Sequence, residues 1–157
     1  MKFSTREDIE APADAVFDAL SDFEAFERAA MRRGADVSRI DPVAPIGEGL
    51  SWNLRFPVRG KMRRMVCILR RYDRASAIGL HGESNGYLAQ LDLTLLALSK
   101  GRTRLGVELE IRPRTLPARL MLQSVRLSKS SYSRRFEARV QKFAADLELQ
   151  HLKPGAL

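Results

Sequence analysis

The stretch Asp8–Phe23, DIEAPADAVFDALSDF, decides the fold, because it joins two kinds of periodicity. Residues 3–9 alternate in polarity with a period of two, which predicts a strand with one mostly apolar face. Pro12 then suits the first turn of a helix, where its missing N–H costs nothing. The apolar residues that follow recur at helical spacing: Val16, Phe17 and Leu20. The chain is therefore expected to pass from strand to helix at Ala11-Pro12.

A second short helix and a series of strands are expected next. Ser21-Asp22 offers a break and a new helix N-cap, and Gly34 is placed to end that helix. From Val37 onward the polarity pattern has a period of two, which predicts strands at 37–40, 50–56, 62–72, 77–83, 87–95 and 105–111. The connecting signals are the loop through Pro42, Pro45, Gly47 and Gly49, the hairpin turn Asn85-Gly86 and the turn Lys100-Gly101. One apolar and one polar face on these strands favour a single antiparallel sheet.

The last segment predicts a long amphipathic helix. Thr115 and Pro117 provide its cap and first turn. Its apolar stripe consists of Val125, Tyr132, Phe136, Val140, Phe143 and Leu147, and the opposite face carries Arg134, Arg135, Arg139 and Lys142. The stretch Ser128–Ser133 is poor in strong helix formers, so we expect a bend there.

Length and composition are those of one globular domain. The chain has 157 residues, 45% of them apolar and 29% charged, so we expect a single domain over 1–152 and a short tail over 153–157. No apolar run is long enough to span a bilayer. Glu7, Asp8 and Glu10 stand where a signal peptide would be apolar, and the single cysteine, Cys67, suits a reducing compartment. A cytoplasmic location is the resulting expectation.

The formal net charge of +8 is unevenly distributed. Acidic residues outnumber basic ones between Met1 and Met31, and the positive excess lies from Arg55 onward. Such an asymmetry fits an anionic partner, such as an acidic membrane surface or a phosphorylated ligand, or serves solubility alone. Nucleic-acid binding is not expected, because the basic residues lack interleaved aromatic residues and no helix-turn-helix pattern is visible. The same features are compatible with a homodimer.

The order of elements, with Ile9-Glu10-Ala11-Pro12 followed by Val16-Phe17, resembles the START and pollen-allergen-like (SRPBCC) superfamily and its polyketide cyclase/dehydrase-like branch. The resemblance implies an α+β helix-grip fold, a curved antiparallel sheet of about seven strands in the order β-α-α-β6-α, wrapped on a long C-terminal helix. It also implies a hydrophobic small molecule, such as a lipid, quinone or polyketide, held between sheet and helix. The ring-hydroxylating branch needs a metal held by two histidines and a carboxylate, and His81 and His151 do not suit it. We therefore expect no metal and no cofactor.

The candidate ligand-binding residues are those expected on the concave side of the sheet and on the terminal helix. Either parity of the strand 62–72 brings an arginine inward, where a guanidinium could bind a carboxylate or phosphate head or else reach to water. Met121, Leu122 and Val125 are expected to close the cavity. The full candidate set is Trp52, Leu54, Arg64, Val66, Ile68, Leu80, Tyr87, Leu91, Leu93, Val107, Leu109, Met121 and Val125.

Glu7 is a weak catalytic candidate. It lies on the apolar parity of the first strand, where burial could raise its pKa enough for acid–base work. A rim position or a structural ion pair is the alternative. No Ser–His–acid pattern accompanies it.

Three functions are compatible with these sequence features. The first is binding or transport of a hydrophobic small molecule without catalysis. The second is a cofactor-free enzyme of the polyketide cyclase/dehydrase kind. The third is a peripheral lipid- or quinone-delivery protein that docks on an anionic membrane through the basic face of the terminal helix.

Overall fold

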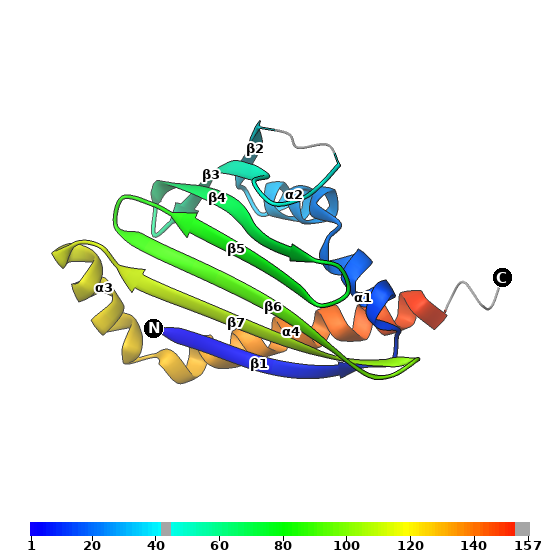
Figure 1. Ribbon diagram of the computed structural model, residues 1–157. Coiled ribbons are helices and arrows are strands. Elements are labelled where there is room, and N and C mark those ends of the chain that lie inside the picture. The colour runs from blue at the N-terminus through cyan, green and yellow to red at the C-terminus, as the bar shows by residue number, and fades with distance from the viewer. Residues whose placement is uncertain (42–44, 153–157) are drawn as a thin grey trace.

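A seven-stranded antiparallel sheet forms the frame of the molecule (Figure 1). The computed structural model describes residues 1–41 and 45–152, so the expected tail 153–157 and residues 42–44 of the expected loop lie outside the described residues. The strands are β1 (Lys2–Ile9), β2 (Asp36–Asp41), β3 (Ser51–Val58), β4 (Lys61–Asp73), β5 (Ala77–Glu83), β6 (Tyr87–Ser99) and β7 (Arg102–Pro113). Their order in the sheet is β1-β7-β6-β5-β4-β3-β2, which confirms the predicted meander of six strands. The structure adds that the first strand, β1, pairs with the last, β7.

The helices are α1 (Ala13–Leu20), α2 (Phe23–Arg32), α3 (Leu116–Arg126) and α4 (Lys129–Leu152). Two predicted caps are confirmed: Asp22 accepts a hydrogen bond from the Ala25 N–H at 3.2 Å, and Thr115 accepts one from the Ala118 N–H at 3.2 Å. Gly34, at φ +92°, ends α2 in the left-handed conformation that glycine adopts without strain.

The terminal helix is broken in two. The chain leaves α3 at Leu127 and enters α4 at Lys129, so the predicted bend is a complete break at the start of the serine-rich stretch. Helix α4 packs along β1, where the Phe3 and Phe136 rings lie 5.9 Å apart. Helix α3 lies instead at one end of the sheet, with Ala118 against the β5–β6 turn at Gly86 (Figure 1).

The abrupt strand-to-helix transition is explained by the core at the α1 end. Ile9, Val16 and Phe17 are fully buried there. The Ala11 N–H donates to the Ile9 carbonyl, and the Ala11 carbonyl accepts from the Thr103 hydroxyl at 2.8 Å. Because the backbone of the turn is satisfied internally, it can be buried while α1 directs its apolar face into the curve of the sheet.

Replacing Thr103 by valine should destabilise the protein, because Thr103 is fully buried and the substitution leaves the Ala11 carbonyl without its donor. We expect Thr103→Val to lower the free energy of unfolding by about 1–3 kcal/mol, measured by urea denaturation. The matched Thr94→Val substitution at an exposed position of β6 should change it by less than about 0.5 kcal/mol. Equal effects of the two substitutions would contradict this account of the turn.

Candidate functional site

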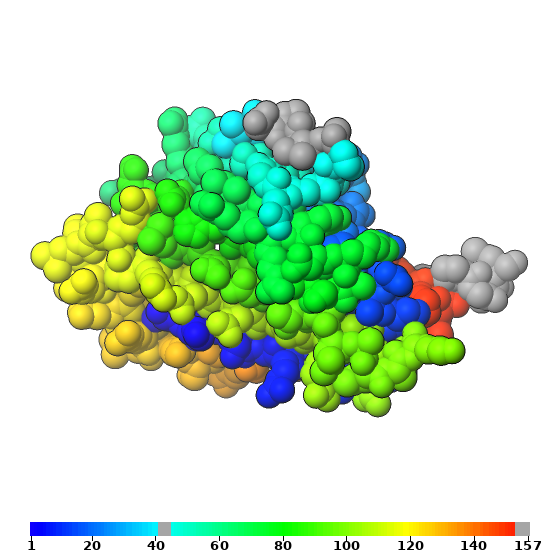
Figure 2. Space-filling view, in the orientation of Figure 1, coloured from blue at the N-terminus to red at the C-terminus, as the bar shows by residue number. Residues whose placement is uncertain are grey.

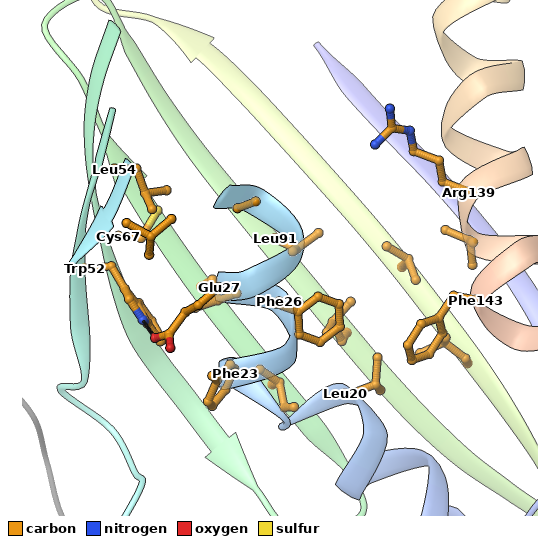
Figure 3. A pocket seen from close by; sticks show the side chains of 18 of the residues that line it. Leu20, Phe23, Phe26, Glu27, Trp52, Leu54, Cys67, Leu91, Arg139 and Phe143 are labelled. Carbon is orange, nitrogen blue, oxygen red and sulfur yellow. Dashed lines mark hydrogen bonds between the residues drawn. The ribbon is translucent and has the colours of Figure 1, made fainter. Parts of the chain in front are cut away.

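A cavity of about 470 Å3 lies between the concave face of the sheet and helices α2 and α4 (Figure 3). This volume is within the range of about 300–1,000 Å3 that is usual for small-molecule pockets. The described residues that line it are Leu20, Phe23, Phe26, Glu27 and Ala30 from α1 and α2, Val37, Trp52, Leu54 and Cys67 from β2–β4, Ile78, Leu80, Leu91, Leu93, Leu105 and Val107 from β5–β7, and Phe136, Arg139, Val140 and Phe143 from α4. Within this set only Glu27 and Arg139 carry a charge at neutral pH.

An aromatic pair spans the outer side of the cavity. The rings of Phe26 on α2 and Phe143 on α4 stack with centroids 6.2 Å apart and an interplanar angle of 28°. Figure 3 shows the two rings side by side between their helices. Phe26 is 45% exposed, so the pair forms the boundary between the cavity and solvent.

Glu27 is a largely buried carboxylate in the cavity wall. It accepts a hydrogen bond from the Trp52 indole N–H at 2.6 Å and one from Nε of Arg39 at 2.8 Å. Burial alone would raise the pKa of Glu27, but the hydrogen bonds from Arg39 and Trp52 outweigh it and the pKa is lowered. Glu27 is therefore ionised at neutral pH, and it fixes α2 to β2 through Arg39 and to β3 through Trp52. Figure 3 shows the contact with Trp52.

Arg139 and Cys67 are the other lining residues with polar chemistry. Arg139 is exposed, and Figure 3 shows its guanidinium pointing away from the Phe26–Phe143 pair, so it forms part of the cavity rim. Burial raises the pKa of the Cys67 thiol to about 11. The thiol is thus neutral at pH 7 and presents a small apolar surface.

Two further findings concern metals and membranes. Within residues 1–41 and 45–152, no three His, Cys, Asp or Glu side chains are grouped so that they could hold a metal ion. Of the helices in the same part of the chain, none has the length and apolar character needed to cross a bilayer.

Six of the expected site residues line the cavity: Trp52, Leu54, Leu80, Leu91, Leu93 and Val107. Arg64, Val66 and Ile68 do not. The β3–β4 register pairs Trp52 with Cys67 and Leu54 with Met65, which turns the other parity of β4 to the concave side. The expectation for Arg64, Val66 and Ile68 is corrected accordingly, because all three lie on the convex face.

The other expected residues also lie outside the cavity. Tyr87 and Leu109 share the concave face but lie nearer to α3. Met121 and Val125 belong to α3, which the helix break directs to the end of the sheet, so the expected closure by α3 is wrong. Glu7 lies opposite Leu105 on the concave side of β1 and is not among the lining residues.

The expected set does not include the two charged lining residues, Glu27 and Arg139. Each is marked by a feature of the sequence. Phe23, Phe26 and Ala30 repeat at helical spacing, and Glu27 falls within the same stripe, where a carboxylate is unusual. Arg139, expected on the polar face of the terminal helix, precedes Phe143 by one turn and shares its side of α4. At both positions a charged residue stands at the border of an apolar stripe.

Comparison with known proteins shows the fold. No protein-family model and no curated protein matches the sequence. Among solved structures, the Zhui aromatase/cyclase from Streptomyces sp. R1128 is similar with a TM-score of 0.64 and 17% identity, covering 94% of this chain and 93% of that one. A START superfamily protein from Mycobacterium smegmatis has a TM-score of 0.56 and 15% identity, covering 90% and 97%. Ara h 8.0201 has a TM-score of 0.57 and 14% identity, covering 90% and 98%.

These neighbours and the observed topology confirm the helix-grip fold, and with it the resemblance to the START and pollen-allergen-like superfamily at the level of the fold. Since the identities are below 20%, the likeness says how the chain is arranged and leaves its chemistry to the site.

Replacing Glu27 by glutamine should have a pH-dependent effect on stability. Because the folded pKa is lowered, the ionised carboxylate contributes its full stabilisation above the unfolded pKa of about 4.3, and this is lost as the pH falls through the folded pKa. We expect Glu27→Gln to cost about 1–3 kcal/mol at pH 7, and the difference from the wild type should shrink towards pH 3. Urea denaturation across this range measures it.

The matched Glu48→Gln substitution removes an exposed carboxylate and should change stability by less than about 0.5 kcal/mol. A cost for Glu27→Gln that stays constant from pH 7 to pH 3 would contradict the assigned role of the charge.

Proposed function

We propose that this protein binds a hydrophobic small molecule in the cavity between the sheet, α2 and α4, and carries or senses it without converting it. The cavity itself is the observation that supports this most directly: about 470 Å3 of space is walled almost entirely by aliphatic and aromatic side chains. Burial of a ligand's apolar surface there would contribute about 25 cal/mol per Å2. Such a lining suits the hydrophobic small molecule that the resemblance implies.

The two charged lining residues give the ligand a direction. Glu27 is ionised and already accepts hydrogen bonds from Trp52 and Arg39, so the side of the cavity near Glu27 disfavours an anion. Arg139 at the rim offers a guanidinium that can pair with a carboxylate or phosphate. The ligand that this arrangement suits has an apolar body and one anionic group at the Arg139 rim.

Cyclase activity is the second candidate, because one similar structure is an aromatase/cyclase. Such chemistry calls for a group that gives or takes a proton near neutral pH. The pKa of Glu27 is lowered, and that of Cys67 is raised to about 11, so neither group is poised for proton transfer at pH 7. The lining therefore favours binding over catalysis.

Filling the cavity tests the proposal. Leu91→Trp places an indole in the hollow, so we expect the affinity for the neutral apolar dye Nile red to fall at least about tenfold, a loss of about 1.4 kcal/mol. Stability should hold, because the added volume occupies empty space. A filled interior would instead make the same substitution destabilising by about 1–3 kcal/mol.

The control is Leu96→Trp on the opposite face of β6, at a side chain that is 57% exposed. It should leave both dye binding and the urea midpoint unchanged. Equal dye binding by the two variants would refute the cavity as the binding site.

The Arg139 assignment is tested by charge. Arg139→Gln should weaken binding of the anionic dye anilinonaphthalene sulfonate by about tenfold, the loss of one charge-assisted contact, and should leave Nile red unaffected. Arg134→Gln, at an exposed position of the same helix, is the control and should affect neither dye. An equal loss for both dyes in Arg139→Gln would show a packing role in place of anion recognition.

A further inference from the structure

Helix α3 presents a bare apolar face to solvent. Leu116, Leu120 and Leu127 are 68%, 57% and 90% exposed. At about 100° per residue, these three positions fall within an arc of about 40° on the helix. The opposite face of α3 is the one that packs on the protein, through the buried Ala118 against the β5–β6 turn. The leucines therefore contribute little to the fold.

The same end of the molecule is strongly basic. Residues 111–136 contain seven Lys and Arg and no Asp or Glu, and the β3–β4 hairpin residues 55–64 contain five and none. The hairpin lies beside α3, since Nη1 of Arg59 is 3.1 Å from the Met121 sulfur. Arg59 thus lies on the Met121 side of α3, and Arg119 and Arg126 project from the other side of the leucine stripe.

Several cations at the opposite end of the fold are paired with carboxylates. At the α1 end, Arg74 pairs with Asp14 and Asp18, and Arg102 and Arg104 pair with Asp8. Among the ion pairs of residues 1–41 and 45–152, none involves Arg59, Arg119 or Arg126. Figures 1 and 2 show α3 as a protruding end of the molecule, opposite α1 and the last turns of α4.

We propose that α3 and the tip of the β3–β4 hairpin form a docking surface for an anionic lipid bilayer. A helix whose leucines enter the headgroup–acyl boundary while arginines on its flanks meet anionic headgroups is the arrangement of an interfacial helix. The surface lies on α3, and differs from the basic face of the terminal helix that the sequence suggested.

A bilayer satisfies this surface better than two other occupants. A second copy of the chain would bring the flanking arginines against those of its partner, and like charges at an interface are costly. An acidic protein would satisfy the arginines, but the leucines project from a protruding helix and need an apolar medium around them. Anionic lipid supplies both the charge and the apolar layer.

The test is co-sedimentation with vesicles of phosphatidylcholine, with and without phosphatidylglycerol. The wild type should bind the anionic vesicles, more weakly as the salt concentration increases, and should not bind the neutral vesicles. Arg119→Gln with Arg126→Gln should reduce partitioning about 30-fold, about fivefold per arginine. Leu116→Gln, Leu120→Gln and Leu127→Gln together should reduce it on the order of a hundredfold.

Matched controls use the same chemistry elsewhere on the surface. Leu149→Gln with Leu152→Gln, at side chains that are 57% and 67% exposed on α4, should keep wild-type binding. Arg32→Gln with Arg33→Gln at the exposed end of α2 should do the same. All of these variants should keep the wild-type urea midpoint, and their Nile red affinity reports the cavity separately, so failure of docking and failure of ligand binding can be told apart.

A local probe completes the test. In Gln123→Trp the new indole stands beside the leucine stripe, so its emission should shift to the blue on anionic vesicles and be quenched by brominated lipid, whereas Gln150→Trp should show neither change. Three outcomes would overturn the proposal. They are no binding to anionic vesicles at low salt, binding that the leucine substitutions leave unchanged, and binding to polyglutamate or self-association in place of vesicle binding.

Discussion

The width of the sheet is the constraint on which the rest of the structure depends. Seven strands spaced about 4.8 Å apart make a face about 29 Å wide, whereas a helix with its side chains is about 10–12 Å across. Helix α4 lies along β1 at one edge, and α2 lies near β2 at the other. Helix α1 covers β6 and β7 at one end only, and beyond it the Phe26–Phe143 pair joins α2 to α4 across the gap. The cavity is a consequence of this geometry.

Two anchors keep the gap from closing. At the α1 end, Phe17 is buried in the curve of the sheet, and the centroids of the Phe17 and Tyr72 rings lie 5.2 Å apart. On the other side, Glu27 holds α2 to β2 and β3 through Arg39 and Trp52. A carboxylate in an apolar wall is costly unless its acceptors are used, and both donors here come from the neighbouring strands. The polar contact sets where α2 lies, so the apolar residues need not collapse onto one another.

The order of elements could be predicted from the sequence, because changes of period and helix caps such as Asp22 and Thr115 are local signals. The sequence could not predict which side of β4 faces the cavity, because its two alternating sets of residues are similarly apolar. A β-bulge between Leu69 and Arg71 lets both Leu69 and Tyr72 face the core, and such a bulge depends on the neighbouring strand. The direction of α3 likewise depends on its packing against Gly86. The cytoplasmic location and the homodimer stay predictions.

The proposed ligand cavity and the proposed docking surface on α3 both present arginines to an anionic group. Arg139 lies about 15 Å along α4 from its first residue, Lys129, which follows α3 almost directly. The Arg139 rim therefore lies on the side of the Phe26–Phe143 pair that faces the basic end of the molecule. The ionised Glu27 lies away from this rim, on α2. An amphiphile taken from an anionic bilayer would keep its head near the arginines and move its apolar body into the hollow. Cations near α3 and at the rim would then guide the same group, first at the membrane surface and afterwards in the complex.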